Sequence, residues 1–171
     1  TTDRALADRT AIVTGASSGI GRRTAELLGK NGADVVLAAR SEGRLNDVAE
    51  MIEQTHDTRT VVQKTDVRNE PDVRRMVNVA VEKFGGIDIL VNNAGILRVA
   101  PSIEEISLED YEDMMGTNVD GMFYATRAAI PHIRESEGNI IFIGSDSGQH
   151  PEPEITVYGA TKWFVRGFAK N

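Results

Sequence analysis

Residues 10–21 read TAIVTGASSGIG, a short apolar run that leads directly into three glycines. The run predicts a buried strand, and helical periodicity begins at Ile20. At such a turn one glycine permits the tight bend, one lets a ligand approach the backbone, and one lets the helix pack closely on the strand. Free amides and the helix dipole then favour an anion. The segment predicts a dinucleotide-binding turn, the alternative being a turn without a ligand. Its candidate binding residues are Gly15, Ser17, Ser18, Gly19, Ile20 and Gly21.

The rest of the chain alternates between apolar runs and helical segments. Short runs rich in Val and Ile predict further buried strands at 34–39, 60–65, 87–92 and 139–145. Helices are expected at 20–31, 42–54, 70–84 and 107–135, and a last one begins near 156 and is still running at 171. Ser107 provides a capping signal for the long helix, and Pro131 predicts a kink in it. We therefore expect an α/β fold with a Rossmann-type, doubly wound parallel sheet.

Composition limits the classes of function. The chain has 171 residues, of which 40% are hydrophobic and 26% charged, so we expect one domain over 1–171. A net charge of -7 argues against nucleic acid and anionic membranes as partners. No cysteine is present and no histidine has partners at metal spacing, so we expect no metal site. No apolar run approaches the ~20 residues of a membrane span, and no signal region opens the sequence; we expect a cytoplasmic protein.

Four further motifs follow the glycine turn. They are Thr65-Asp66-Val67, Asn92-Asn93-Ala94-Gly95, Thr117-Asn118-Val119, and Ser145 followed by Tyr158-x-x-x-Lys162. Each is weak alone, but their order and their places on the expected elements are specific. Together with TGASSGIG, they make nearly the whole chain resemble the short-chain dehydrogenase/reductase family.

The resemblance implies a strand order of 3-2-1-4-5 and an oxidoreductase that transfers hydride between a nicotinamide and an alcohol or carbonyl substrate. It implies a homodimer or homotetramer, formed through the long helix that holds Tyr124 and the helix that holds Tyr158. The implied catalytic residues are Asn118, Ser145, Tyr158 and Lys162. The implied cofactor-binding residues beyond the glycine turn are Asp66, Val67, Asn92, Ala94, Gly95, Tyr158 and Lys162.

Tyr158 and Lys162 are four residues apart, so a helix places them on one face. A neighbouring ammonium favours the ionised form of a phenol, which can then exchange a proton with a substrate oxygen. Ser145, at the end of a strand, can hydrogen-bond the same oxygen. The resemblance adds that Asn118 supports a water relay to Lys162, and that Lys162 contacts the nicotinamide ribose. Spacing alone shows only that Tyr158 and Lys162 can cooperate.

The residues after the second strand bear on the choice of cofactor. An acidic residue there would bind the ribose 2′-hydroxyl of NAD, whereas an arginine accommodates the 2′-phosphate of NADP. Here Ala39 stands where the acid is expected, and Arg40 follows. We therefore expect NADP(H) rather than NAD(H), with Arg22 as a possible second cation. The alternative is that both arginines are solvated surface residues.

The sequence departs from the family pattern after the active-site helix, because the usual sixth and seventh strands and a substrate lid are absent. We expect an exposed apolar edge at 139–143 and exposed Trp163, Phe164 and Phe168. We infer a longer natural polypeptide, and expect weak or absent turnover from 171 residues alone. The alternative is a truncated protein that needs a partner. A different class of function also stays open: a non-catalytic nucleotide-binding or interaction protein on this fold. The sequence does not identify the substrate.

Overall fold

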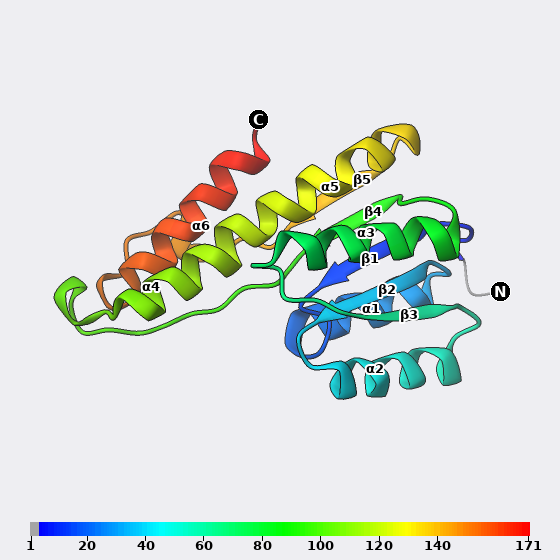
Figure 1. Cartoon of the computed structure of the whole chain (residues 1–171), viewed down its shortest axis with the longest axis horizontal. Coiled ribbons are helices and arrows are strands. Elements are labelled where there is room, and N and C mark those ends of the chain that lie inside the picture. The colour runs from blue at the N-terminus through cyan, green and yellow to red at the C-terminus, as the bar shows by residue number, and fades with distance from the viewer. Residues whose placement is uncertain (1–3) are drawn as a thin grey trace.

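The computed structural model describes residues 4–171 and contains a parallel, five-stranded sheet between helices (Figure 1). The strands lie in the order β3-β2-β1-β4-β5. Their bounds are β1 (Thr10–Thr14), β2 (Asp34–Ala39), β3 (Thr60–Lys64), β4 (Ile89–Asn92) and β5 (Asn139–Phe142). The helices are α1 (Gly19–Lys30), α2 (Glu42–Thr55), α3 (Glu70–Phe84), α4 (Leu108–Met115), α5 (Gly121–Glu135) and α6 (Thr156–Ala169). The expected doubly wound fold and its strand order are confirmed.

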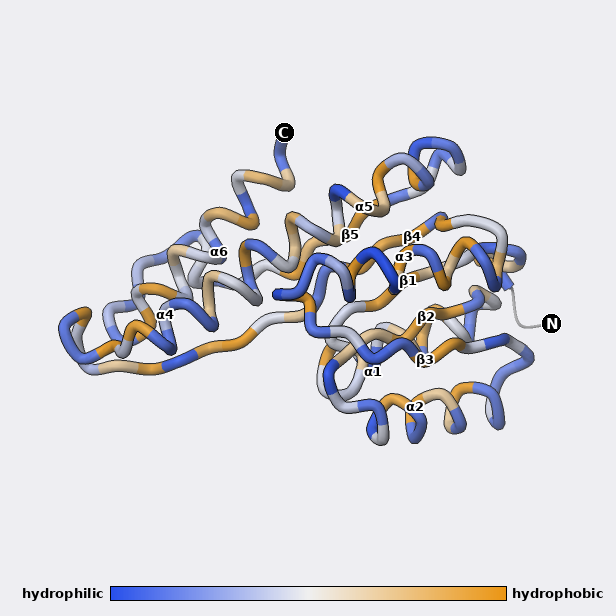
Figure 2. The backbone as a smooth tube through the Cα atoms, viewed as in Figure 1, coloured by the Kyte–Doolittle hydropathy of each residue, from blue (hydrophilic) through white to orange (hydrophobic). Residues whose placement is uncertain are grey.

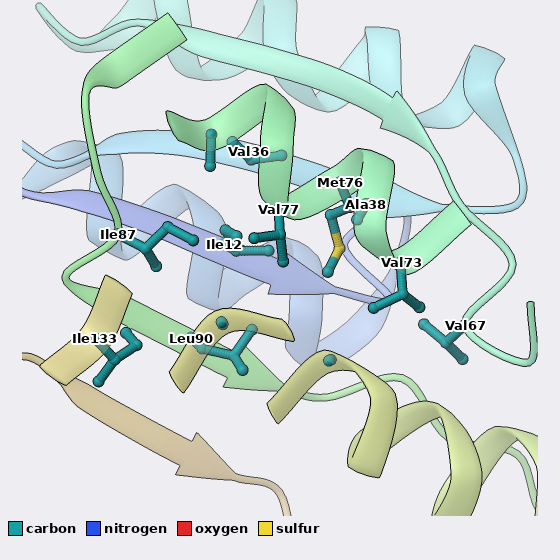
Figure 3. Packing of buried hydrophobic residues seen from close by; sticks show 13 residues of the cluster. Ile12, Val36, Ala38, Val67, Val73, Met76, Val77, Ile87, Leu90 and Ile133 are labelled. Atoms are coloured by element: carbon teal, nitrogen blue, oxygen red, sulfur yellow. The ribbon is translucent and has the colours of Figure 1, made fainter. Parts of the chain in front are cut away.

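Two apolar layers hold the sheet between its helices. On one face, α1 and α2 cover alternate residues of β1 and β2, including Val13 and Leu37. On the other face, α3 and α5 pack over Ile12, Val36 and Leu90, as Figure 3 shows. Figure 2 shows hydrophobic colour concentrated along the central strands, while α2 alternates between polar and apolar stretches. Both faces of the central strands are therefore buried, which explains their continuous apolar runs.

The long helix expected over 107–135 is three elements in the structure. Ser107 caps it as expected, because its hydroxyl accepts a hydrogen bond from the Asp110 amide at 3.0 Å. The helix continues through Pro131 to Glu135. Its irregular segment lies earlier, where Gly116–Asp120 forms a π-helical turn that joins α4 to α5. Such turns often occur at functional sites, and this one contains Asn118.

The last strand ends earlier than the apolar run predicts. β5 stops at Phe142, because Ser145 already caps a short turn over Asp146–Gly148. The last helix ends at Ala169, whereas the sequence predicted that it was still helical at Asn171. As expected, β5 is an edge strand, with Ile141 exposed on it.

The aromatic side chains of α6 differ in their exposure. Trp163 and Phe164 are exposed as expected, but the expectation for Phe168 was wrong. Its ring lies 5.9 Å from that of Phe142 and 6.5 Å from that of Phe123, so three elements meet around a half-buried Phe168. Across the described residues, no helix has the length and apolar character that crossing a membrane requires.

A pair of leucine substitutions tests the assignment of the core. Leu90 is 0% exposed between β4 and the helices of its face, whereas Leu108 is 78% exposed. We expect Leu90→Ala to lower the free energy of unfolding by about 2–5 kcal/mol, because it leaves a cavity. Leu108→Ala should change it by less than about 0.5 kcal/mol. Urea unfolding of both variants measures the difference, and equal losses would contradict the packing described here.

Candidate functional site

A cavity of about 780 Å³ opens at the carboxyl ends of the strands. This volume is in the range of known small-molecule sites. The cavity lies where the strand order reverses between β1 and β4, the place where ligands bind in such sheets. Its walls are Gly15, residues 17–20, residues 39–41, Arg44, residues 65–67, residues 93–97, Thr117, Ile143, Gly144, Tyr158 and Lys162.

The glycine turn forms one wall, and its three glycines have different surroundings. Gly15 and Gly19 have φ angles of +67° and +52°, which disfavour other residues. A Cβ at Gly19 would meet no atom within 4 Å, so its backbone is open to a ligand. A Cβ at Gly21 would instead overlap the Gly15 carbonyl oxygen and the Asn93 amide. Gly21 does not line the cavity, and its role is close packing of α1 on the turn.

The first amides of α1 are available to a ligand. Ser18 is the N-cap residue, yet its side chain makes no capping hydrogen bond, and the first turn has no acidic residue. Helix N-termini with free amides bind anions. Ser17, Ser18 and Ile20, which are predicted cofactor-binding residues, line the cavity around these amides.

Asn93 and Thr14, which sequence reasoning missed, hold the turn in place. The Asn93 side-chain amide donates to the Thr14 carbonyl at 2.9 Å and to the Gly15 carbonyl at 3.3 Å. The Thr14 hydroxyl accepts from the backbone amides of Asn93 and Ala94, at 3.0 Å each. The sequence signal for this role was the second asparagine of the Asn92-Asn93 doublet. It follows β4, and β4 is a direct neighbour of β1 in the sheet.

Asn92, a predicted cofactor-binding residue, lies outside the cavity. Its buried amide donates to the Thr126 hydroxyl at 3.0 Å and so joins β4 to α5. Asn92 is the last residue of β4 and Asn93 already lies beyond it, so the two asparagines of the doublet have different partners. Ala94 and Gly95, from the same motif, do line the cavity.

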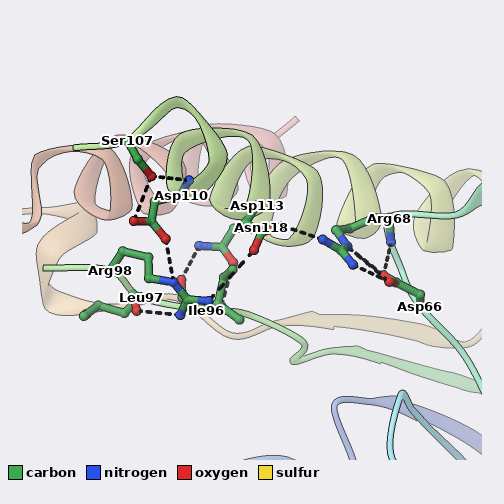
Figure 4. A network of polar contacts seen from close by, with 9 residues as sticks. All are labelled: Asp66, Arg68, Ile96, Leu97, Arg98, Ser107, Asp110, Asp113 and Asn118. Carbon is green, nitrogen blue, oxygen red and sulfur yellow. Dashed lines mark hydrogen bonds and ion pairs between the residues drawn. The ribbon is translucent and has the colours of Figure 1, made fainter.

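The wall after β3 contains Asp66 and Val67, both predicted cofactor-binding residues. Arg68 donates from Nε to Asp66 Oδ1 at 3.0 Å and from Nη2 to Oδ2 at 2.7 Å, as Figure 4 shows. This hydrogen-bonded guanidinium is the main cause of a lowered pKa of Asp66, although partial burial opposes it. Asp66 is therefore a carboxylate whose charge is compensated within the protein.

The loop after β2 presents two arginines. Arg40 is exposed and lines the cavity, as does Arg44 on the first turn of α2, which sequence reasoning missed. Arg44 lies four residues after Arg40, and a helix starting at Glu42 brings it back toward the loop. Arg22 is exposed on α1 and does not line the cavity.

Asn118, a predicted catalytic residue, does not itself line the cavity, although Thr117 does, and it joins the π-turn to two other segments. It is 2% exposed; its Oδ1 accepts from the Ile96 amide at 2.8 Å, and its Nδ2 donates to the Ile96 carbonyl at 2.9 Å. Nδ2 also donates to the Thr161 hydroxyl on α6 at 3.0 Å. A Cβ at Gly95 would lie 3.4 Å from Asn118 Oδ1 and 3.8 Å from Lys162 Nζ, so these residues are close neighbours.

Tyr158 and Lys162 line the cavity from α6, on one helix face as the spacing predicts. The Lys162 ammonium lies 5.7 Å from the centre of the Tyr158 ring and donates to the Ile143 carbonyl at 2.7 Å. Lys162 is 6% exposed, and burial lowers its pKa below the usual lysine value. A desolvated cation is therefore held beside the phenol.

Ser145 lies at the end of a short hydrogen-bonded chain. Its hydroxyl is 3.3 Å from that of Ser147, and the Ser147 hydroxyl donates to Glu152 at 2.6 Å. The turn packs on α6, since a Cβ at Gly148 would lie 2.8 Å from the Lys162 carbonyl oxygen. Ser145 itself does not line the cavity, although Ile143 and Gly144 just before it do.

No set of three or more His, Asp or Glu side chains within residues 4–171 has the arrangement of a metal site. The polar groups that line the cavity are amides, hydroxyls, two arginines, one lysine and the Asp66 carboxylate, which is paired with Arg68.

Comparison with known proteins gives a family match over nearly the whole chain. The family model described as short chain dehydrogenase matches residues 9–171. An 11-beta-hydroxysteroid dehydrogenase A from Sesamum indicum is 39% identical over 163 residues, which are 95% of this chain and 47% of that protein. An uncharacterized oxidoreductase from Staphylococcus aureus is 40% identical over 158 residues, which are 92% of this chain and 67% of that protein.

Solved structures agree with the sequence relatives. An alcohol dehydrogenase from Thermococcus sibiricus, complexed with 5-hydroxy-NADP, superposes with a TM-score of 0.91 at 30% identity. That match covers 95% of this chain and 68% of the other. The chain thus spans about half the length of the Sesamum indicum relative and about two thirds of the other two proteins.

The packing of Gly21 on the glycine turn can be tested by one methyl group. We expect Gly21→Ala to lower the free energy of unfolding by about 1–3 kcal/mol, because the Cβ overlaps backbone of the turn and the Asn93 amide. Gly43→Ala is the matched control; its Cβ would have nothing within 4 Å, and alanine favours the helix by up to about 1 kcal/mol. Thermal unfolding compares the two, and a Gly21→Ala variant as stable as Gly43→Ala would refute the packing role.

Proposed function

The chain belongs to the short-chain dehydrogenase family, and on this premise we propose that it forms the cofactor-binding and catalytic domain of an NADP(H)-dependent oxidoreductase acting on a small alcohol or carbonyl compound. One observation carries the proposal. The glycine turn and the pair Tyr158–Lys162 line the same cavity, although they lie at opposite ends of the chain. An anion-binding wall and a proton-transferring pair thus face one space.

The residues present fit a dinucleotide. The free amides after Ser18 and the open backbone at Gly19 suit a pyrophosphate, since a ligand can approach without meeting a side chain. Asp66 and Val67 line the wall where the resemblance expects the adenine. Lys162 Nζ lies at the opposite wall, next to Gly95, where it can donate to a ribose hydroxyl.

The proposed chemistry is proton transfer by the chain beside hydride transfer by the cofactor. When bound, the nicotinamide supplies or accepts the hydride. Tyr158 exchanges a proton with the substrate oxygen, and the Lys162 ammonium beside its ring stabilises the phenolate. Ser145, which directly follows Gly144 of the cavity wall, orients the same oxygen once its hydroxyl turns from Ser147. Asn118 fixes Ile96 and Thr161, and so positions both walls of the reaction site.

Two arginines support NADP(H) over NAD(H). Arg40 and Arg44 both line the cavity next to the end of β2, where the ribose 2′-position is expected. Ala39 provides no carboxylate there that would bind a 2′-hydroxyl or repel a phosphate. The Thermococcus sibiricus protein, a structural relative, is itself complexed with an NADP derivative.

The role of Tyr158 is tested by removing its hydroxyl. The assay uses the full-length polypeptide, because we expect weak or absent turnover from the 171 residues alone. With NADPH and a panel of ketones, we expect Tyr158→Phe to lower kcat by about 100-fold or more while cofactor affinity stays within about twofold. Tyr111→Phe is the matched control, because Tyr111 is an exposed residue of α4 outside the cavity. NADPH binding without turnover in both full-length wild type and full-length Tyr158→Phe would favour a non-catalytic nucleotide-binding protein.

The cofactor assignment is tested by reversing one charge. We expect Arg40→Asp to lower the ratio of NADPH affinity to NADH affinity by about tenfold or more, because a carboxylate repels the 2′-phosphate. Arg22→Asp makes the same charge change outside the cavity and should leave the ratio nearly constant. Titration of NADPH and NADH fluorescence measures both affinities, and an unchanged ratio in Arg40→Asp would defeat the assignment.

A further inference from the structure

Asp66 is the one carboxylate among the residues that line the cavity. An anionic cofactor would meet this charge at the wall next to Arg40 and Arg44. A free carboxylate at that place would repel a phosphate and attract a nearby arginine. The way in which the protein controls the charge of Asp66 therefore matters for the choice of cofactor.

Arg68 forms hydrogen bonds with both oxygens of the Asp66 carboxylate. Its Nε lies 3.0 Å from Oδ1 and 3.1 Å from Oδ2, and its Nη2 donates to Oδ2 at 2.7 Å. The Arg68 backbone amide also donates to Oδ1 at 3.1 Å. A planar guanidinium that meets a carboxylate through several bonds is the strong form of this pair, and a lysine would not reproduce it.

The guanidinium is held in place from its other side as well. Its Nη1 pairs with Asp113 of α4 (Figure 4). The aliphatic part of Arg68 covers Gly116, where a Cβ would lie 3.3 Å from Arg68 Cγ and 3.4 Å from Cδ. Arg68 is thus fixed by a second carboxylate and by the π-turn, which limits its freedom to leave Asp66.

Arg40 and Asp66 follow neighbouring strands, since Ala39 of β2 pairs with Lys64 of β3 and the Thr65 amide donates to the Ala39 carbonyl at 2.9 Å. The charge of Arg40 contributes, after that of Arg68, to the lowered pKa of Asp66. Arg40 and Asp66 line one cavity. Within residues 4–171, the exposed Arg40 side chain forms no hydrogen bond or ion pair with another residue. If Arg68 were removed, Asp66 would become an available partner for Arg40.

We propose that Arg68 is a specificity-determining positioning residue, which occupies Asp66 and thereby leaves Arg40 free to bind an anionic group of the cofactor. The inference rests on the proposed function, since it concerns how the same site prefers a 2′-phosphate. Arg68 acts through Asp66 and Arg40 and does not itself line the cavity. Loss of Arg68 should therefore affect a phosphorylated cofactor more than an unphosphorylated one.

The test is a comparison of NADPH and NADH dissociation constants by fluorescence titration of the purified protein. We expect Arg68→Met to lower the NADPH-to-NADH affinity ratio about fivefold, the scale of one partly exposed charge interaction. Adding Asp66→Asn should restore the ratio to within about twofold of that of Asp66→Asn alone, since no free carboxylate then competes for Arg40. Arg74→Met is the matched control, because Arg74 pairs with Glu70 at 3.4 Å on the exposed side of α3.

The outcomes separate the inference from the proposed function. Wild type that binds neither cofactor would overturn both. Wild type that prefers NADPH, with the same ratio in Arg68→Met, would overturn the role of Arg68 alone. An equal loss for the two cofactors, or a loss that persists with Asp66→Asn, would reduce Arg68 to a structural residue. If Arg68→Met does not fold, Arg68→Lys replaces it. We then expect the NADPH-to-NADH affinity ratio to fall below that of wild type, but by less than about fivefold, because one ammonium cannot hold both oxygens of Asp66. An unchanged ratio in Arg68→Lys would overturn the role of Arg68.

Discussion

The approach of Gly21 to Gly15 across the first turn is the contact on which the site depends. The Gly15 carbonyl and the Asn93 amide occupy the space that a side chain at Gly21 would need. Because this contact is backbone on backbone, α1 starts directly behind β1 and directs its free amides into the cavity. Asn93 adds the end of β4 to the same arrangement through its bonds to Thr14 and Gly15. The ends of β1 and β4, between which the strand order reverses, are thus joined by hydrogen bonds at the place where the cavity opens.

Local patterns predicted the strands and helices and the doubly wound class of fold, while the strand order and most candidate residues of the cavity wall came from the family resemblance. The continuous apolar runs of β1 and β2 reflect strands buried on both faces. The exact ends of the elements did not follow from these patterns. β5 stops at Phe142 since Ser145 turns back to cap its own short helix, and a run of apolar letters cannot show that.

The side chains whose roles were missed or misplaced depend on tertiary structure. Asn92 and Asn93 are adjacent in sequence, but Asn92 at the end of β4 reaches Thr126, whereas Asn93 just beyond the strand reaches the glycine turn. Arg44 reaches the cavity only because α2 begins close to the end of β2. Phe168 is half-buried because β5 and α5 both supply an aromatic partner for it. Sequence reasoning named the residues that we propose bear the chemistry, while the residues that position them needed the structure.

The electrostatics of the cavity run against those of the whole chain. The net charge is -7, yet the charged residues that line the cavity are Arg40, Arg44, Lys162 and the single carboxylate Asp66. Remote surface acids are screened over about 8 Å at physiological ionic strength, so an anion in the cavity responds mainly to these four groups and to the amides of α1. Since Arg68 compensates Asp66, the local field is positive even though the global one is not. Overall charge is therefore a poor guide to the ligand here, and the distribution of charge around the carboxyl ends of the strands is the relevant quantity.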